Sequence, residues 1–205
     1  MSIIYDKSRK IFHLQAGNTS YIMQVVKNKY LVHLYWGRRI SSYHESRQII
    51  WKDRGFAPNP DAADRTFSLD TLPQEYPQTG NGDYRNPAYG ICQENGSRIS
   101  NLEYKGYDIV DGKPEFLGLP ASFGNKEDVQ TLKVYMEDPV AGLKVCLLYS
   151  VFKDQSIITR SVNFINQSDK VIYLKKMLSM SMDIREDEFD VLTLYGAHNN
   201  ERNMD

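Results

Sequence analysis

The sequence lacks several features that would mark a specialised class of protein. It has only two cysteines in 205 residues, and its 25 basic side chains nearly balance its 26 acidic ones, for a formal net charge of -1. No stretch approaches the ~20 consecutive apolar residues of a transmembrane helix. The balanced charge gives no electrostatic reason to bind nucleic acid or an anionic membrane. These absences favour a globular protein with neither kind of partner.

Motifs for metals, phosphates and catalytic nucleophiles are missing as well. Cys92 and Cys146 each lack a nearby second cysteine, and the four histidines are spread along the chain without a His-x-x-x-His pair. No Gly-x-Ser-x-Gly, Gly-x-Gly-x-x-Gly or Gly-Lys-Ser/Thr occurs. We therefore expect no metal and no cofactor. The cysteines are interpreted as two reduced thiols that fill core space, although a disulfide stays open.

The first residues give no sign of export. They lack the basic start, the apolar run and the small-residue cleavage site of a signal peptide, so we expect a cytoplasmic location.

Proline is concentrated in one place. Five of the eight prolines lie between Ala57 and Gly90, namely Pro58, Pro60, Pro73, Pro77 and Pro87. Proline fixes φ and removes a backbone donor, so neither a long helix nor a central strand can run through this segment. Residues 41–56 show no clean period, although Tyr43–Trp51 is compatible with a helical turn or two. We predict a long loop over residues 41–90.

The composition of this loop indicates order and function, with disorder as the alternative. Its apolar side chains exceed what a solvated linker needs: Phe67, Leu69, Leu72, Tyr76, Tyr84 and Tyr89. Its charged side chains suit a hydroxyl-rich or charged ligand: Asp61, Asp64, Arg65, Asp70, Glu75, Asp83 and Arg85. Asp61 and Asp64 can equally be turn and cap residues that accept hydrogen bonds from backbone N–H groups.

The rest of the chain has the two-residue period of strands. Short polar turns separate β-branched and aromatic runs before the loop, at residues 3–5, 11–15, 19–26 and 30–36. After the loop the runs are 98–110, with a bulge expected near Gly106, then 129–136, 143–151, 156–166 and 171–183, followed by a strand-like 191–195. The last four long runs are predicted to form a meander. Short turns and no crossover helix predict an all-β sandwich of antiparallel sheets.

Individual side chains add little chemistry. His13 and His33 lie in apolar strands and are interpreted as packed strand residues, whereas His44 lies in a polar loop. His198, in Gly-Ala-His-Asn-Asn, is the best functional histidine. The methionines at 177, 180 and 182 are interpreted as sheet core. Residues 196–205 read as a loop cut in mid-course, so we expect a fragment of a longer domain.

The amino-acid sequence of the loop and its flanks resembles that of a known family. The segments that carry this resemblance are Pro58-Asn59-Pro60-Asp61, Asp64-Arg65-Thr66-Phe67-Ser68-Leu69-Asp70, Gly82-Asp83-Tyr84-Arg85-Asn86-Pro87, His33-Leu34-Tyr35-Trp36-Gly37 and Tyr195-Gly196-Ala197-His198-Asn199-Asn200-Glu201-Arg202. They resemble the N-terminal region of glycoside hydrolase family 36 α-galactosidases, from end to end and in order. The resemblance implies that residues 1–205 belong to an antiparallel β-supersandwich of the galactose-mutarotase-like type and form only part of it.

The resemblance also implies a function. Family members are retaining enzymes that hydrolyse terminal α-D-galactosyl residues of sugars such as melibiose and raffinose. Their aspartate nucleophile and aspartate acid/base lie on a catalytic barrel that this sequence does not contain, so the chain would supply no catalytic residue and would be inactive alone. The implied partners are an α-galactoside sugar, the missing barrel and further copies in a homo-oligomer. We also expect the exposed apolar surface of such a piece to drive self-association.

Three residues match family positions near the sugar. Asp53 matches a carboxylate that reaches galactose, and Arg65 matches an arginine that can hold that carboxylate or the loop. His198 matches a position near the substrate where several relatives carry tryptophan, so a hydrogen bond would replace ring stacking. Two other functions stay open: a stand-alone carbohydrate-binding β-sandwich, and a self-contained all-β hydrolase.

Overall fold

A computed structural model describes residues 2–44, 49–53, 55, 59–118, 121–183 and 190–204. Ala57 and Pro58, at the start of the proline-rich segment, lie outside the described residues, as does the middle of the Tyr43–Trp51 stretch. The described chain consists of strands and loops without a helix. The strands are β1 (Ile3–Asp6), β2 (Ile11–Ala16), β3 (Thr19–Val26), β4 (Tyr30–Arg38), β5 (Tyr89–Gln93), β6 (Glu103–Asp111), β7 (Val129–Asp138), β8 (Leu143–Phe152), β9 (Ile157–Asn166), β10 (Ile172–Met177), β11 (Leu194–Ala197) and β12 (Asn200–Met204).

Two four-stranded antiparallel sheets form the body of the molecule. The first has the order β1-β2-β3-β4 and the second the order β6-β7-β8-β9, so neighbours in sequence are neighbours in space. The expected bulge is present, because the pairing of β6 with β7 shifts register between Tyr104 and Gly106. The predicted all-β class with antiparallel sheets is thereby confirmed.

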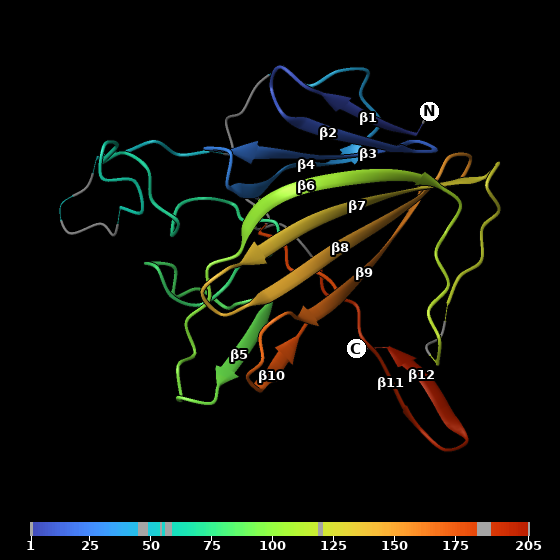
Figure 1. Cartoon of the computed structure of the whole chain (residues 1–205). Coiled ribbons are helices and arrows are strands. Elements are labelled where there is room, and N and C mark those ends of the chain that lie inside the picture. Colours follow the sequence, from blue (N-terminus) through green and yellow to red (C-terminus); the bar gives the residue numbers. More distant parts are fainter. Residues whose placement is uncertain are drawn as a thin grey trace.

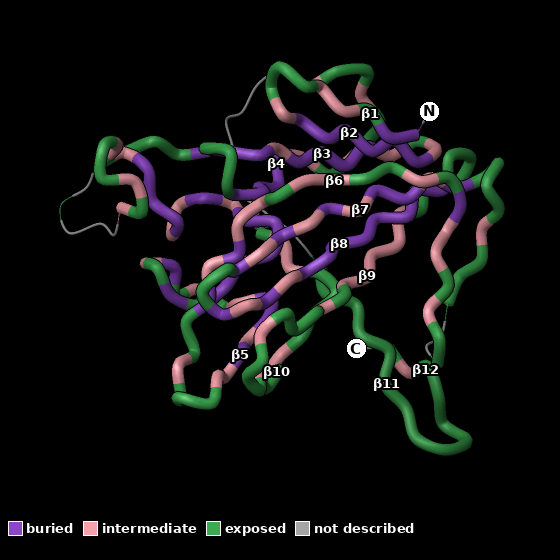
Figure 2. Tube along the Cα trace, viewed as in Figure 1, coloured by how far each residue is buried: buried purple, intermediate pink, exposed green. Residues whose placement is uncertain are grey.

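The two sheets stack face to face around one core (Figure 1). The first sheet contributes Phe12, Leu14 and Met23, all with no exposed surface, and the second contributes alternate residues of β7 and β8. On β8 these alternate residues are Leu143, Val145, Leu147, Tyr149 and Val151, as the period of two predicts. Figure 2 shows the buried residues running along the strands of both sheets.

The first sheet is buried on its outer face as well. Ile22, Val32 and Leu34 point away from the main core and join a second apolar cluster. The loop covers them with Phe67, Leu69 and Leu72, each at most 1% exposed. The described part of the loop therefore forms a third layer on the sandwich, and its apolar side chains order it by burial.

Several predictions near the chain's end are wrong. The run 171–183 forms a strand only over β10, which pairs with β5 in a separate two-stranded sheet rather than with β9. The fourth strand of the meander is instead β6. Neither β5 nor β12 was predicted. The strand-like 191–195 overlaps β11 at Leu194 and Tyr195, and β12 pairs with it where a loop was expected over 196–205. Met177 and Met180 are 56% and 46% exposed and lie outside the core, whereas Met182 packs against it.

Exposed apolar side chains lie on β10, on β11 and on residues next to each of these strands. They are Tyr173, Leu174, Met177, Leu178, Val191, Leu192, Leu194 and Tyr195. Self-association through these side chains stays a prediction. Within the described ranges, no helix has the length and apolar character needed to cross a bilayer.

Candidate functional site

The structure brings two of the three predicted site residues together. A guanidinium nitrogen of Arg65 lies 3.3 Å from a carboxylate oxygen of Asp53, and the side chains are 68% and 54% exposed. A carboxylate accepts hydrogen bonds and a guanidinium donates them, so the pair offers both functions to a ligand rich in hydroxyls. An ion pair this exposed adds little to stability, so its groups stay available to a ligand.

Backbone and ring contacts fix the segments that carry this pair. The backbone N–H of Lys52 donates to the carbonyl oxygen of Thr66 at 3.2 Å, so the residues next to Asp53 and Arg65 are directly bonded. One residue further out, the rings of Trp51 and Phe67 pack with centroids 5.7 Å apart. Phe67 in turn is buried on the first sheet. The exposed pair is therefore held beside one buried ring, Phe67, and one exposed ring, Trp51.

The alternative role of Asp61 and Asp64 as turn residues is confirmed. Asp61 accepts a hydrogen bond from the backbone N–H of Ala63 at 3.0 Å. Asp64 accepts from both the N–H and the hydroxyl of Thr66, at 3.0 and 2.6 Å. The Lys27 ammonium and these Thr66 donors lower the pKa of Asp64 from 3.8 to about 2. These carboxylates shape the loop that presents Arg65.

His198 lies elsewhere. It occupies the turn between β11 and β12, next to Asn199, whose φ of 62° places it in the left-handed region. The side chain is exposed. Figure 1 shows this hairpin projecting on the opposite side of the view from the loop that carries Asp53. The structure does not bring His198 to the Asp53–Arg65 pair within one chain.

A second arginine–carboxylate pair lies inside the sandwich, where the sequence did not point to one. Glu75 has no exposed surface, and a guanidinium nitrogen of Arg160 on β9 lies 2.8 Å from its carboxylate. The hydroxyl of Tyr21 on β3 donates to it at 2.8 Å, and that of Tyr149 on β8 at 2.9 Å. His33 on β4 places Nδ1 3.7 Å away. Glu75 thus connects the loop to both sheets.

Burial sets the protonation of this buried cluster. It raises the pKa of the Tyr21 and Tyr149 hydroxyls well above 10, and the nearby Glu75 charge adds to the effect, so both stay hydrogen-bond donors. Burial is the largest single influence on Arg160 and opposes its charge, but the Glu75 carboxylate and the neighbouring tyrosines together outweigh it, so the pKa of Arg160 is raised. For His33 burial is the larger cause and lowers the pKa below 6.5. The cluster joins an arginine–glutamate ion pair to an imidazole whose neutral form is favoured by burial.

Asp83 and Arg85 are also structural. The carboxylate of Asp83, with no exposed surface, accepts hydrogen bonds from the Gln74 amide and the Arg85 guanidinium, both at 2.8 Å. Arg85 also donates to the carbonyl oxygens of Leu69 and Leu72, at 3.1 and 2.7 Å. The prediction that Glu75 and Asp83 equip a ligand site is wrong, because both carboxylates are buried and already have partners inside the domain. Arg85 stays partly exposed and also pairs with the exposed Asp183 at 2.8 Å.

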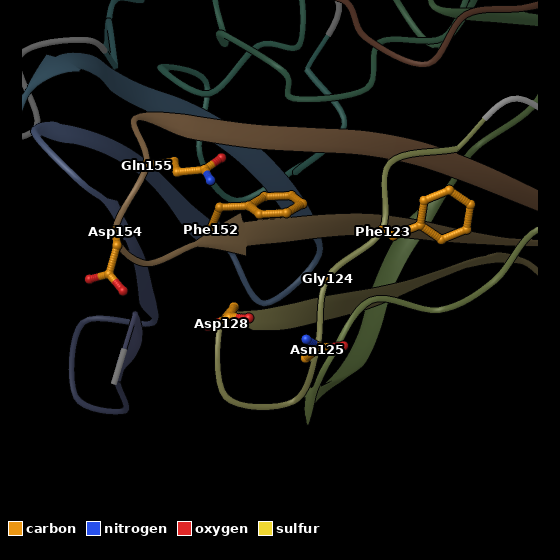
Figure 3. Close-up of a pocket in the computed structure, with 7 residues that line it drawn as sticks. All are labelled: Phe123, Gly124, Asn125, Asp128, Phe152, Asp154 and Gln155. Carbon is orange, nitrogen blue, oxygen red and sulfur yellow. The ribbon is translucent and has the colours of Figure 1, made fainter.

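Two surface hollows lie apart from the three predicted residues. One of about 400 Å³ lies between the segment 123–128 and the turn that follows β8, and Figure 3 shows its lining. Another of about 280 Å³ borders the buried cluster at Tyr21, Tyr149 and Arg160. Among the described residues, no group of three histidine, cysteine or carboxylate side chains is placed to hold a metal ion. Both cysteines are free thiols, Cys146 buried and Cys92 partly exposed.

Comparison with known proteins places this geometry in a family. The glycosyl hydrolase family 36 N-terminal domain matches residues 29–205. The α-galactosidase AgaA of Geobacillus stearothermophilus is 43% identical over 98% of this chain, and the bifunctional α-galactosidase/sucrose kinase AgaSK of Mediterraneibacter gnavus is 44% identical over all of it.

Solved structures agree with the sequence relatives. The crystal structure of the family 36 α-galactosidase AgaB from Geobacillus stearothermophilus covers the whole chain with a TM-score of 0.92 at 43% identity. That of AgaA A355E D548N in complex with raffinose covers 96% with a TM-score of 0.89. The chain spans 28% of AgaA and 22% of AgaSK. With a family match over most of its length, the chain belongs to the N-terminal domain of glycoside hydrolase family 36.

Proposed function

We propose that this chain is the substrate-contacting N-terminal part of an α-galactosidase that acts on sugars of the melibiose and raffinose type. The nucleophile and the acid/base belong to a catalytic barrel outside these residues, so the chain alone hydrolyses nothing. The proposed partners are an α-galactoside, that barrel and further copies of the same protein.

One observation carries this proposal: an exposed Asp53–Arg65 pair on a loop that is anchored by burial in a family 36 domain. Relatives 43% identical in sequence have been crystallised with raffinose and with stachyose. The pair offers charged groups that can form hydrogen bonds with sugar hydroxyls. The Lys52–Thr66 hydrogen bond and the contact between the Trp51 and Phe67 rings hold the two segments that carry it.

The chemistry assigned to each residue is simple. The Asp53 carboxylate accepts hydrogen bonds from galactose hydroxyls, and Arg65 orients that carboxylate through their ion pair. His198 contacts the sugar from the β11–β12 hairpin. Since the hairpin and the loop project on different sides of one chain, an oligomer in which they come from different subunits suits this assignment.

A chimera tests the proposal. Residues 1–205 replace the matched segment of AgaA from Geobacillus stearothermophilus, and hydrolysis of raffinose and an aryl α-galactoside is measured. We expect an active chimera, an inactive isolated chain, and a rise in KM of about 10- to 100-fold for Asp53→Ala, because hydrogen bonds to a charged group contribute ~1.5–3 kcal/mol. An active chimera that Asp53→Ala leaves unchanged would contradict the site. Tight galactoside binding by the isolated chain would instead support a stand-alone binding module.

A further inference from the structure

Lys27 lies in the tight turn between β3 and β4, far in sequence from the loop that carries Asp53. Lys27 and Asn28 have φ values of 51° and 60°, and the N–H of Lys29 donates to the carbonyl oxygen of Val26 at 3.0 Å. Two successive positive φ values are typical of a type I′ hairpin turn. The turn therefore holds the backbone of Lys27 in one place on the rim of the first sheet.

From this position the lysine contacts the loop through its charge. Its ammonium donates to the carboxylates of Asp64 at 2.7 Å and Asp61 at 3.2 Å. These hydrogen bonds raise the pKa of Lys27, so the ammonium stays charged at neutral pH. One cation thus connects the two turn carboxylates that precede Arg65.

The same ammonium faces the rings beneath the Asp53–Arg65 pair. It lies 5.9 Å from the centroid of Trp51 and 5.7 Å from that of Phe67, within the range of a cation–π contact. Trp51 lies two residues before Asp53, and Phe67 lies two residues after Arg65. Lys27 therefore contacts both segments that carry the pair, although it belongs to a different part of the chain, the turn between β3 and β4.

From this arrangement we infer that Lys27 is a positioning residue for galactoside binding, and that it acts by holding the Asp53 and Arg65 segments together at the distance the sugar requires. The inference rests on the proposed function and extends it to a residue in another structural element. Side chains that present a ligand-binding pair need such support, because small displacements weaken every hydrogen bond to the ligand.

The AgaA chimera tests this inference with a matched control. Lys27→Met removes the ammonium and keeps the length of the side chain. Lys29→Met makes the same change two residues away, where the ammonium forms its ion pair with Glu103 at 2.9 Å and Asp61 is only a minor electrostatic influence. We expect Lys27→Met to raise KM for raffinose about 10-fold with kcat changed less than about 2-fold, since it weakens substrate binding and leaves the chemical step intact. Lys27→Arg should restore most of the affinity, and Lys29→Met should leave KM unchanged.

Two further measurements separate positioning from a general loss of stability. If Lys27 acts through Asp53, the double variant Lys27→Met/Asp53→Ala should bind no worse than Asp53→Ala alone. Hydrogen exchange should speed up in Lys27→Met, and not in Lys29→Met, at the amide of Lys52, which bonds the Thr66 carbonyl across the two segments, and at the amides of Thr66 and Phe67, which bond Asp64, a partner of Lys27.

The outcomes also distinguish this inference from the proposed function. If Asp53→Ala changes nothing, the site itself fails. If Asp53→Ala weakens binding but Lys27→Met and Lys29→Met behave alike, Lys27 is not a positioning residue and the proposed site stands. Additive losses in the double variant would likewise overturn the inference.

Discussion

Two of the arginine–carboxylate pairs in this molecule have completely different surroundings. Arg160 and Glu75 lie 2.8 Å apart with side chains 8% and 0% exposed, between two sheets. Arg65 and Asp53 lie 3.3 Å apart and are more than half exposed, on the outer loop. The same chemical pair is buried at one site and solvated at the other.

This difference separates structure from binding. A buried charge must have its partners inside the protein, and Glu75 has them in Arg160, Tyr21 and Tyr149. Such a carboxylate is committed to the fold. The exposed pair loses little when a ligand competes for its hydrogen bonds, so it can serve recognition. In this loop, burial rather than residue type decides which carboxylates are exposed to a ligand.

The largest expected difference between the two pairs is tested by a substitution of Glu75. Glu75→Gln keeps the shape but leaves the Arg160 charge buried without its counter-charge. Removing one partner of a buried ion pair costs about 3–5 kcal/mol, and we expect that loss in the free energy of unfolding by urea. Asp53→Asn is the matched change in the exposed pair, and it should cost less than about 1 kcal/mol. Similar losses in both variants would show that burial does not distinguish the two pairs.

A pair of tyrosines sharpens the comparison with a smaller effect. Tyr149 donates to buried Glu75 at 2.9 Å, and Tyr135 donates to Asp108 at 2.8 Å on the surface. Tyr149→Phe should lower the free energy of unfolding by about 1.5–3 kcal/mol, since it removes a hydrogen bond to a buried charge. Tyr135→Phe makes the same deletion in water and should change stability by less than about 0.5 kcal/mol. An equal effect of the two deletions would contradict the role assigned to Tyr149.

The strands were predictable where local pattern decides them. In β7 burial largely follows the period of two, and in β8 alternate residues join the main core although nearly the whole strand is buried. The short turn between them leaves only an antiparallel neighbour. The position of β10 was not predictable in this way. Its partner β5 follows the proline-rich loop far upstream, and no sequence period reports a pairing between distant segments.

The buried cluster around Glu75 was not predictable for the same reason. Tyr21 and Tyr149 reach Glu75 across separations of 54 and 74 residues, so only the folded chain brings them together. One signal in the sequence was available: Arg160 interrupts the apolar alternation of its strand. Glu75, between Gln74 and Tyr76 in the proline-rich segment, gives no such sign. Asp53 and Arg65, by contrast, were found through family resemblance and not from any local pattern.

Mild acid should act on the buried pair's surroundings before it acts on the outer loop. The pKa of His33 is lowered below 6.5 because burial outweighs the attraction of Glu75, so below that pH the unfolded chain binds a proton that the folded chain refuses. Stability should therefore fall as the pH falls from about 7 to 5, by at most ~1.4 kcal/mol per pH unit for each proton. Urea unfolding at several pH values measures this slope.

A single substitution assigns the slope to its source. His33→Gln should reduce the slope of stability against pH by at most the contribution of one proton, ~1.4 kcal/mol per pH unit. The slope should not vanish, because burial also lowers the pKa of His13. The outer loop should not respond over this range: the pKa of Asp64 is lowered from 3.8 to about 2, so its contribution is complete above 3.8 and is lost only as the pH falls toward 2. Hydrogen exchange at Thr66, corrected for the intrinsic pH dependence, should stay constant from about pH 7 to 5. A wild-type slope in His33→Gln, or earlier loss of protection at Thr66, would mean that the neutral imidazole is not what makes the interior sensitive to acid.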